Sequence, residues 1–232
     1  MKRTIRKDGR VIEYTLICSV NRRNILLQAL PEGKIRVYAP KNARLKEVDN
    51  VVFSRLDWIG EMHEKLDEEI RAHAFDPEKG VLIEGMRVRI ETQRAVKVSV
   101  SLEGGVLKVA SPSLENKRIE EEIRKYLCAL ALDRIRENLD LYAPGIGREY
   151  GRVTIREQKT RWGSCSQKKN LNFNWKLILA PKEALTYVVI HELCHLIHFN
   201  HSDRFWAEVG ARMPEYDVWR KWLRVHGKEL TL

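Results

Sequence analysis

Several features that define common classes of protein are scarce or missing in this sequence. No run approaches the about 18 uncharged apolar residues that a membrane-spanning helix needs, so no membrane partner is expected. Glu13 interrupts the only apolar run after the basic N-terminus, which argues against a secretory signal peptide. The 13 glycines and 7 prolines among 232 residues are too few for a collagen-like or low-complexity chain. Four cysteines, none in a CxxC pair, make no disulfide framework, so we expect a soluble cytoplasmic protein.

The remaining composition indicates a globular chain with a basic surplus. Hydrophobic residues make up 44% and charged residues 32%, which excludes wholesale disorder, and the length suits one large or two small domains. The formal net charge is +10, and residues 148–169 hold seven Lys and Arg against Glu149 and Glu157. This basic segment is either a solvated surface or a site for an anionic partner such as nucleic acid, a nucleotide or an acidic peptide.

The periodicity of apolar residues predicts an α+β protein in two parts. Residues 1–112 contain β-rich segments around one long helix over residues 45–73. Pro112 marks the boundary that we expect between this N-terminal α+β region and a second domain over residues 113–232. The second domain opens with an amphipathic helix over residues 114–142.

A strand and a helix are predicted next in the second domain. Residues 171–179 alternate between apolar and polar side chains, which indicates a half-buried strand with one polar face. Pro181 is well placed for the first turn of a helix that contains an H-E-x-x-H pattern. We expect this active-site helix to pack on a small sheet.

The pattern His191-Glu192-Leu193-Cys194-His195 places two imidazoles on one face of that helix. At about 100° per residue, His195 lies about 40° and Glu192 about 100° from His191 around the helix axis. The two histidines are one turn, roughly 6 Å, apart, and their nitrogens can converge on one ion at about 2.0–2.1 Å. The opposite side of the helix carries an apolar stripe that can be buried, formed by Leu185, Val189, Ile190, Leu193, Leu196 and Ile197.

A catalytic zinc takes three protein ligands and keeps a fourth position open. His201 is the best third candidate because it lies ten residues after His191. Asn200 can adopt the left-handed conformation that ends a helix, and Ser202 can cap the next helix. Such a tight turn would bring His201 back towards the ion.

Other residues near the pattern have alternative interpretations. His198 projects one turn beyond His195 and either supports a ligand or replaces one, and Glu208 on the following helix is a further possibility. Cys194 is expected to be a small packed thiol, and Met213 is expected to pack at a helix end.

These parts predict a hydrolytic mechanism. Zinc would lower the pKa of its bound water from about 15.7 towards about 7, and Glu192 would take the proton and pass it to the leaving group. Arg161, with Asn172 and Asn174 on the polar edge of the predicted strand, is a candidate for holding the substrate. An extended peptide can pair with a free strand edge through its main chain.

Several separated blocks occur in a characteristic order, namely Lys159-Thr160-Arg161-Trp162-Gly163-Ser164-Cys165, Asn174-Trp175, the H-E-x-x-H pattern, Asn200-His201-Ser202 and Phe205-Trp206. In these blocks the sequence closely resembles the YgjP-like metal-dependent hydrolases, which are related to the WLM and SprT-like zincin peptidases. The resemblance implies a minimal zincin peptidase domain with one Zn²⁺ per chain, held by His191, His195 and His201, and with Glu192 as acid and base. In the Arg-Trp-Gly-Ser-Cys block, Trp162 either supports the floor of the site or touches the substrate.

Three functions stay open, and a metallopeptidase acting on protein or peptide is the one that we expect. The second is a metal-dependent nucleotide phosphoanhydride hydrolase, which the basic residues 148–169 would serve, although a two-metal carboxylate set and a Gly-rich phosphate loop are missing. The third is a nucleic-acid-associated protease, as among the SprT-like relatives, or a binding module with a structural metal. A structural zinc ordinarily has a fourth Cys or His ligand, which argues against the last of these.

Overall fold

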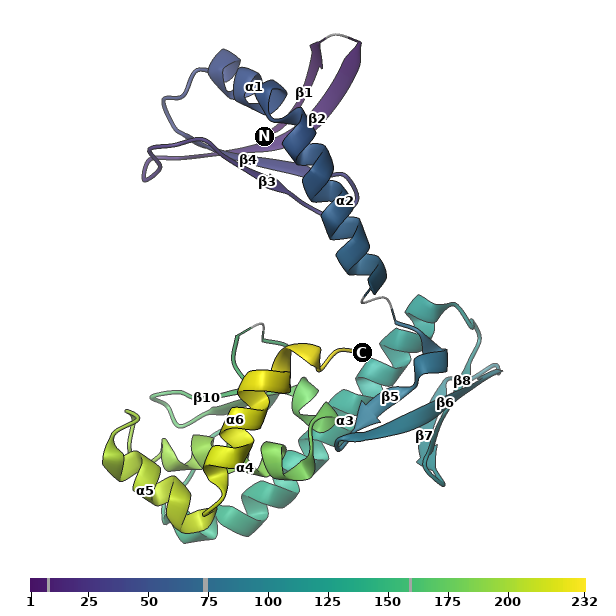
Figure 1. The fold of residues 1–232 in the computed structure, drawn as a ribbon. Helices are drawn as coiled ribbons and strands as arrows, with labels where there is room; N and C mark the ends of the chain where they lie inside the picture. Colours follow the sequence, from purple (N-terminus) through teal and green to yellow (C-terminus); the bar gives the residue numbers. More distant parts are fainter. Residues whose placement is uncertain (8, 73–74, 159) are drawn as a thin grey trace. The chain divides into compact units, whose positions relative to one another are not determined.

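The computed structural model divides the chain into unit 1 (Met1–Ala74) and unit 2 (Phe75–Leu232) (Figure 1). The structure describes residues 1–7, 9–72, 75–158 and 160–232. Lys159, in one of the blocks quoted above, lies outside the described residues.

Unit 1 consists of a four-stranded sheet and two helices. The strand order is β1-β2-β4-β3, in which β2 and β4 are parallel and the other neighbours antiparallel. The strands are β1 (Lys2–Lys7), β2 (Arg10–Ser19), β3 (Leu26–Ala29) and β4 (Ile35–Pro40). The single helix predicted over residues 45–73 is divided at Arg55 into α1 (Leu45–Ser54) and α2 (Leu56–Ala72). The Ser54 hydroxyl donates to the Val51 carbonyl at the end of α1, a local bond that competes with helix continuation.

The helices of unit 1 cover one face of its sheet. Val48, Val52 and Ile59 of the helices are buried against alternate residues of the strands, as the two-residue period of a strand requires. These strand residues are Ile5, Ile12, Tyr14, Leu16, Ile35, Val37 and Ala39. No described element of unit 1 covers the other face of the sheet.

Unit 2 contains two small sheets and four α-helices among its described residues. The first sheet has the order β5-β6-β8-β7 and the second the order β10-β11-β9. The strands are β5 (Val81–Ile83), β6 (Met86–Arg94), β7 (Ser99–Glu103), β8 (Val106–Ser111), β9 (Val153–Arg156), β10 (Gly163–Cys165) and β11 (Leu171–Asn174). The helices are α3 (Asn116–Tyr142), α4 (Lys182–Cys194), α5 (Asp203–Arg212) and α6 (Tyr216–His226), with short 3₁₀ turns η1 (Pro77–Lys79), η2 (Pro144–Ile146), η3 (Trp175–Leu179) and η4 (Gly227–Glu229).

The boundary between the units lies after Ala74, earlier in the chain than the boundary after residue 112 that was expected from the sequence. Residues 75–112 share one hydrophobic core with the rest of unit 2 instead of joining the N-terminal strands. The turn between β5 and β6 docks on η3, because the Glu84 N–H donates to the Ile178 carbonyl at 2.6 Å. The Glu84 carboxylate also pairs with Arg134 of α3 at 2.7 Å and with Lys182 of α4 at 3.3 Å.

Only the first part of the strand predicted over residues 171–179 is a strand, namely β11. β11 ends at Asn174, whose side-chain oxygen accepts from the Lys176 N–H at 3.2 Å, and Trp175–Leu179 continue as η3. An asparagine that bonds to the backbone two residues ahead starts a turn. Three consecutive residues of η3 are then fully buried, which a strand with one polar face cannot achieve: Leu177, Ile178 and Leu179.

The architecture is therefore α+β. Along the chain of unit 2, the long helix α3 follows the strands of the first sheet and precedes those of the second. In the described part of the chain, no helix combines the length and apolar character required to span a membrane. The core of unit 2 runs from the first sheet through α3 to α4, and it fixes the helix that carries the H-E-x-x-H pattern.

Candidate metal centre

The helix α4 is buried on the side away from its histidines. Leu185, Val189, Ile190 and Leu193 are at most 3% exposed, as the apolar stripe of the sequence requires. Helix α3 packs against this side and buries a row of its own apolar residues in the same core. Because the back of α4 is held by packing, the direction of His191 is set by the fold and not by the side chain alone.

The chain leaves α4 through tight turns. Cys194 is the last helical residue, and the N–H groups of Leu196 and Ile197 donate to Leu193 and Cys194 at 3.0 Å. Asn200 does not take the left-handed conformation that the sequence suggested, since the non-glycine residues with positive φ in the described chain are elsewhere. The helix end is instead tightened by the two hydrogen bonds from Leu196 and Ile197, each of which spans three residues as in a 3₁₀ turn. Ser202 is the residue before α5, but its side chain makes no capping bond.

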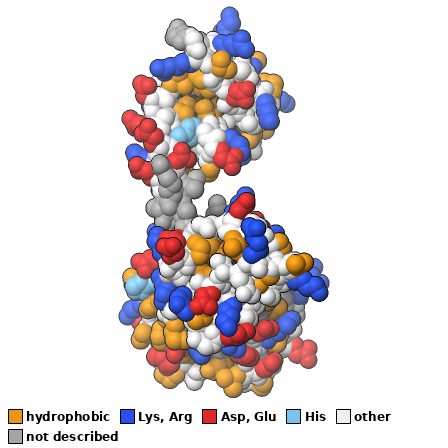
Figure 2. Space-filling view, turned by 90° about the vertical axis from the view of Figure 1, so that its right-hand side faces the viewer, with side chains coloured by type: hydrophobic (Ala, Val, Ile, Leu, Met, Phe, Trp, Pro, Cys, Tyr) orange, Lys and Arg blue, Asp and Glu red, His pale blue; other side chains and the backbone are white. Residues whose placement is uncertain are grey.

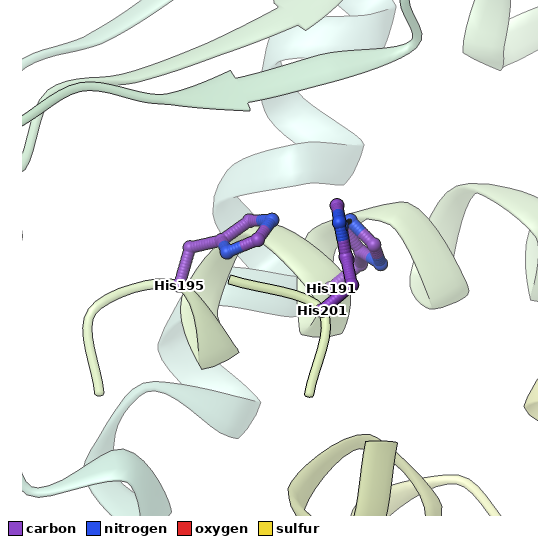
Figure 3. Close-up of side chains that lie close together, drawn as sticks. All are labelled: His191, His195 and His201. Atoms are coloured by element: carbon purple, nitrogen blue, oxygen red, sulfur yellow. Dashed lines mark hydrogen bonds between the residues drawn. The ribbon is translucent and has the colours of Figure 1, made fainter. Parts of the chain in front are cut away.

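Three imidazoles meet at the end of α4 (Figure 3). His191 and His195 come from α4 and its last turn, and His201 comes from the segment before α5. The ring centroids of the three residues are 4.8–5.0 Å apart, and one ligand nitrogen from each lies within 4.8 Å of the other two. The Nε2 atoms of His191 and His201 are 3.1 Å apart. Nitrogens this close, on three converging rings, fit a shared cation with tetrahedral geometry.

Hydrogen bonds and burial prepare these rings to bind a cation. The Nδ1 atom of His195 lies 3.0 Å from the His198 carbonyl, so this nitrogen carries the proton and Nε2 keeps its lone pair. Burial lowers the pKa of His191 to about 3, with smaller contributions from His195, His201 and Arg220. Burial also lowers the pKa of His195. Neutral imidazole is the form that binds metal, so the donor set suits a divalent ion near pH 7.

Glu192 is held in a dry position beside the three histidines. Its side chain is 4% exposed, and its Oε2 atom has no hydrogen-bond partner among the described residues. Burial raises the pKa of Glu192 to about 8, against the opposing effects of the Arg161 charge and a hydrogen bond from the Cys165 N–H. A buried carboxyl with one unpartnered oxygen is a candidate for proton transfer.

The Arg-Trp-Gly-Ser-Cys block forms the wall that faces Glu192. Gly163 touches the carboxyl side chain, because a Cβ built there would stand 2.5 Å from Oε1 of Glu192. The Cys165 N–H donates to the same side chain. Trp162 packs on Gly227, because a Cβ built at Gly227 would stand 2.6 Å from the Cζ2 atom of Trp162. The block thus ties the strand β10 to α4 on one side and to the end of α6 on the other.

A cavity of about 600 Å³ opens beside the histidines. Arg161 lines it, together with Arg220 and Arg224 of α6, and Glu192 is the one acidic side chain among the described lining residues. Asn174, which the sequence analysis grouped with Arg161, lies elsewhere: it is 3% exposed and does not line this cavity. Its amide donates to the carbonyls of Gln158 and Arg161 at 2.8 and 3.3 Å, so it holds the loop that carries Arg161.

The alternative ligands weighed from the sequence have other places. The His198 carbonyl accepts from His195, while Glu208 forms an ion pair with Arg212. Cys194 is fully buried, and Met213 is 5% exposed in the same core. The described residues therefore offer the three histidines as the cluster that suits a metal.

An aromatic stack supports the third histidine. The His201 ring lies on the Trp206 ring with centroids 5.6 Å apart, and Trp206 stacks on Tyr216 at 5.4 Å. The Arg220 guanidinium lies 4.3 Å from the centroid of Trp206. Arg220 and Tyr187 also line the cavity, and neither was predicted from the sequence as a site residue. Tyr187 had a signal, since it lies one turn before His191 on α4, but Arg220 had none.

A buried carboxylate beside three converging imidazoles is the arrangement of a metal-dependent hydrolase. A family model described as "YgjP-like, metallopeptidase domain" matches residues 23–226, and the chain therefore belongs to the YgjP-like metallopeptidase family. No curated protein matches the chain. A similar solved structure is the metallopeptidase zymogen of Pyrococcus abyssi abylysin, with 26% sequence identity over 42% of this chain and 93% of that chain, and a TM-score of 0.35.

Proposed function

We propose that the chain is a zinc-dependent peptidase in which His191, His195 and His201 hold one Zn²⁺ and Glu192 is the general base and acid. The convergence of three imidazoles beside a buried carboxylate carries this proposal. A bound zinc ion supplies Lewis acidity, since it lowers the pKa of water towards about 7 and polarises a carbonyl oxygen. Nitrogen ligands favour zinc over Ca²⁺ and Mg²⁺, which prefer oxygen.

In this proposal Glu192 carries the proton from the attacking water to the leaving amine. A carboxyl whose pKa lies near neutrality both accepts and releases a proton at little cost, which is what a general base that later acts as an acid requires. Burial raises the pKa of Glu192, and the positive charges of Arg161 and of a cation at the histidines lower it again. Gly163 and the Cys165 N–H keep the carboxyl in place.

We propose that an extended peptide binds along β10. In the sheet β10-β11-β9, β11 is central, so its polar edge is not available in the way that the sequence suggested. β10 has a strand partner on one side only among the described residues, and it begins at Gly163 beside Glu192. Main-chain groups at such an edge can pair with a substrate backbone. Arg161, just before β10, is then positioned to contact a side chain of the peptide.

A nucleotide phosphoanhydride hydrolase is the second candidate function. The observation that favours it is the trio of guanidinium groups on the cavity, from Arg161, Arg220 and Arg224. Guanidinium groups bind phosphate oxygens in a bidentate manner, and the same charges also suit an acidic peptide. The two candidates share the metal and the base, and they differ in the substrate group that the three guanidinium groups would contact.

One set of assays separates the candidates. Purified protein should contain about one zinc per chain. If neither the peptide assay nor the nucleotide assay detects metal-dependent activity, both candidate functions are overturned. The Glu192→Gln variant should lose about 100-fold or more of the hydrolysis of unfolded protein or acidic peptides. Nucleoside triphosphates are tested in parallel, and metal-dependent turnover of these alone would replace the peptidase proposal with the second candidate. Glu183→Gln, at an exposed position of the same helix, is the matched control and should retain activity.

We also propose that the protein works in a reducing, cytoplasmic compartment. All four cysteines are unpaired thiols: Cys18, Cys128, Cys165 and Cys194. Burial raises the pKa of Cys165 and of Cys194 to about 11, so neither thiol is readily ionised near pH 7. Free thiols are the usual state of cysteine in a reducing compartment.

A further inference from the structure

Unit 1 separates its charges between its sheet and its helices. Residues 1–44, which form the strands and their connections, hold eleven Lys and Arg against three Asp and Glu, a net charge of +8. Residues 45–72, which form α1 and α2, hold four Lys and Arg against eight Asp and Glu, a net charge of −4. In Figure 2 the Lys and Arg side chains of unit 1 lie mostly towards the top of the view. Such a separation produces a positive potential on the strands.

The face of the sheet that the helices leave open arranges its side chains in rows. The strand register pairs Thr15 with Lys2 on one side and with Arg36 on the other, and Arg36 with Gln28, so one polar and basic row crosses all four strands. The adjacent row is apolar and aromatic, because the register pairs Tyr38 with Ile17 and Leu26. The Arg22 guanidinium lies 4.5 Å from the centroid of the Tyr38 ring.

Both rows are accessible, and no described residue forms an ion pair with their basic side chains. Ile17 is 39% exposed and Leu26 is 50% exposed. Among the described residues, none forms an ion pair with Lys2, Arg6 or Arg36, and the strand positions on this face include a single acid, Glu13. Exposed apolar side chains beside unpaired basic ones are the composition of a binding surface and not of a plain solvated face.

We propose that this open sheet face binds single-stranded nucleic acid. Phosphates would contact the basic row at Lys2 and Arg36, and a base would stack on the neighbouring row at Tyr38 and Arg22. Unpaired bases offer both a flat face and a nearby phosphate, which this alternation of rows matches. An acidic protein would satisfy the charges but would leave the aromatic row without a stacking partner, and a duplex keeps its bases stacked on one another.

This surface lies wholly in unit 1, so its test does not depend on the metal centre. The full chain is titrated into fluorescein-labelled single-stranded RNA and DNA of about 12 nucleotides, and binding is followed by fluorescence anisotropy at several salt concentrations. We expect binding that weakens as salt rises, because phosphate contacts release counterions. The same oligonucleotide as a duplex should bind more weakly. Duplex binding that equals or exceeds single-strand binding would overturn the proposal.

Two variants assign the binding to the rows. Tyr38→Leu keeps an apolar side chain but removes the stacking ring, and should weaken binding about tenfold without changing the salt dependence. Arg36→Gln should weaken binding and reduce the slope of log affinity against log salt by about 1. Arg152→Gln, in the basic segment over residues 148–169 of unit 2, is the matched control and should bind normally. Circular dichroism establishes that each variant is folded.

The outcomes separate the proposed surface from general charge attraction. An equal loss in Arg152→Gln and Arg36→Gln would overturn the proposal, because binding would then follow net charge. Competition by poly-glutamate as effective as competition by unlabelled oligonucleotide would also overturn it and would assign the surface to acidic protein. Full binding by a folded Tyr38→Leu variant would show that no base stacks on Tyr38 and would overturn the proposal.

Discussion

The backbone of Gly163 packs directly against the side chain of Glu192. A Cβ at position 163 would stand 2.5 Å from Oε1 and 2.7 Å from Cγ of Glu192, closer than real Cβ contacts come. Since Gly163 opens β10 and Glu192 lies on α4, this contact sets the separation between the two walls of the cavity. Glycine is therefore required here for close approach and not for an unusual backbone angle.

The Gly163→Ala variant is expected to lose activity and keep its metal. The added methyl group must displace Glu192, and a misplacement of about 1 Å costs about 100-fold in rate. Peptide hydrolysis and zinc content, measured on the same preparation, test this. Gly145→Ala is the matched control, because beyond its chain neighbours no atom lies within 4 Å of the position that a Cβ would take there. Full activity in Gly163→Ala would show that the carboxyl position is not critical.

His201→Ala and His198→Ala are expected to differ in metal affinity. Loss of His201 removes one of the three proposed nitrogen donors, and we expect zinc affinity to fall by more than the about 10–100-fold that supporting residues cost. The side chain of His198 is not needed, because only its carbonyl contacts His195. Zinc titration against a competing chelator measures both variants. The reverse order of affinities would exchange the roles of the two residues.

Asn174→Ala is expected to destabilise the protein rather than to weaken substrate binding directly. The buried amide donates to Gln158 and Arg161 and accepts from Lys176. Unsatisfied buried groups cost about 1–3 kcal/mol each, so the free energy of unfolding should fall by at least that amount. Urea denaturation measures it, with the exposed Gln167→Ala as control. Unchanged stability with a raised KM would instead restore the substrate contact predicted from the sequence.

Tyr14 should make the stability of unit 1 sensitive to alkaline pH. Burial raises the pKa of Tyr14 to about 12, and its hydroxyl donates to Asp49 at 2.6 Å. The ordinary pKa is about 10, so the folded unit retains the proton more strongly than the unfolded chain does between these values. Its contribution is complete below about pH 10 and is lost as the pH rises towards 12.

The Tyr14→Phe variant isolates this contribution. Near pH 9 the variant should be less stable than the wild type by about 1 kcal/mol, the worth of one hydrogen bond. Near pH 11 the difference should shrink, because the other groups titrate alike in both proteins. Chemical denaturation followed by circular dichroism at the two pH values measures this. A difference that grows with pH would contradict the raised pKa.

The parts of the candidate site that depend on neighbours along the chain could be predicted from the sequence. The proximity of His191 and His195 follows from helix geometry alone, and the buried stripe of α4 follows from its apolar period. His201 needed only a short turn, although the turn is made by the tightened end of α4 and not by a left-handed Asn200.

The parts that depend on distant segments could not be predicted in this way. Nothing in the spacing of Gly163 and Glu192 indicates their contact, and Arg220 reaches the cavity only because α6 packs on α4. The extent of unit 2 was missed for the same reason, since residues 75–112 join it through core contacts with α3 and η3. The alternation over residues 171–179 was a local pattern that the Asn174 turn interrupted.

Because His201 stacks on Trp206 and Trp206 on Tyr216, the H-E-x-x-H pattern alone does not identify a chain with a complete metal centre. The third imidazole rests on a tryptophan that is itself braced by α6, so a homologous chain could retain H-E-x-x-H unchanged and still be a pseudoenzyme once α6 is lost. Genome surveys that score the five-letter string alone would count such chains as peptidases. A search that requires the H-E-x-x-H pattern together with the equivalents of His201, Trp206 and Tyr216 would separate peptidases from pseudoenzymes.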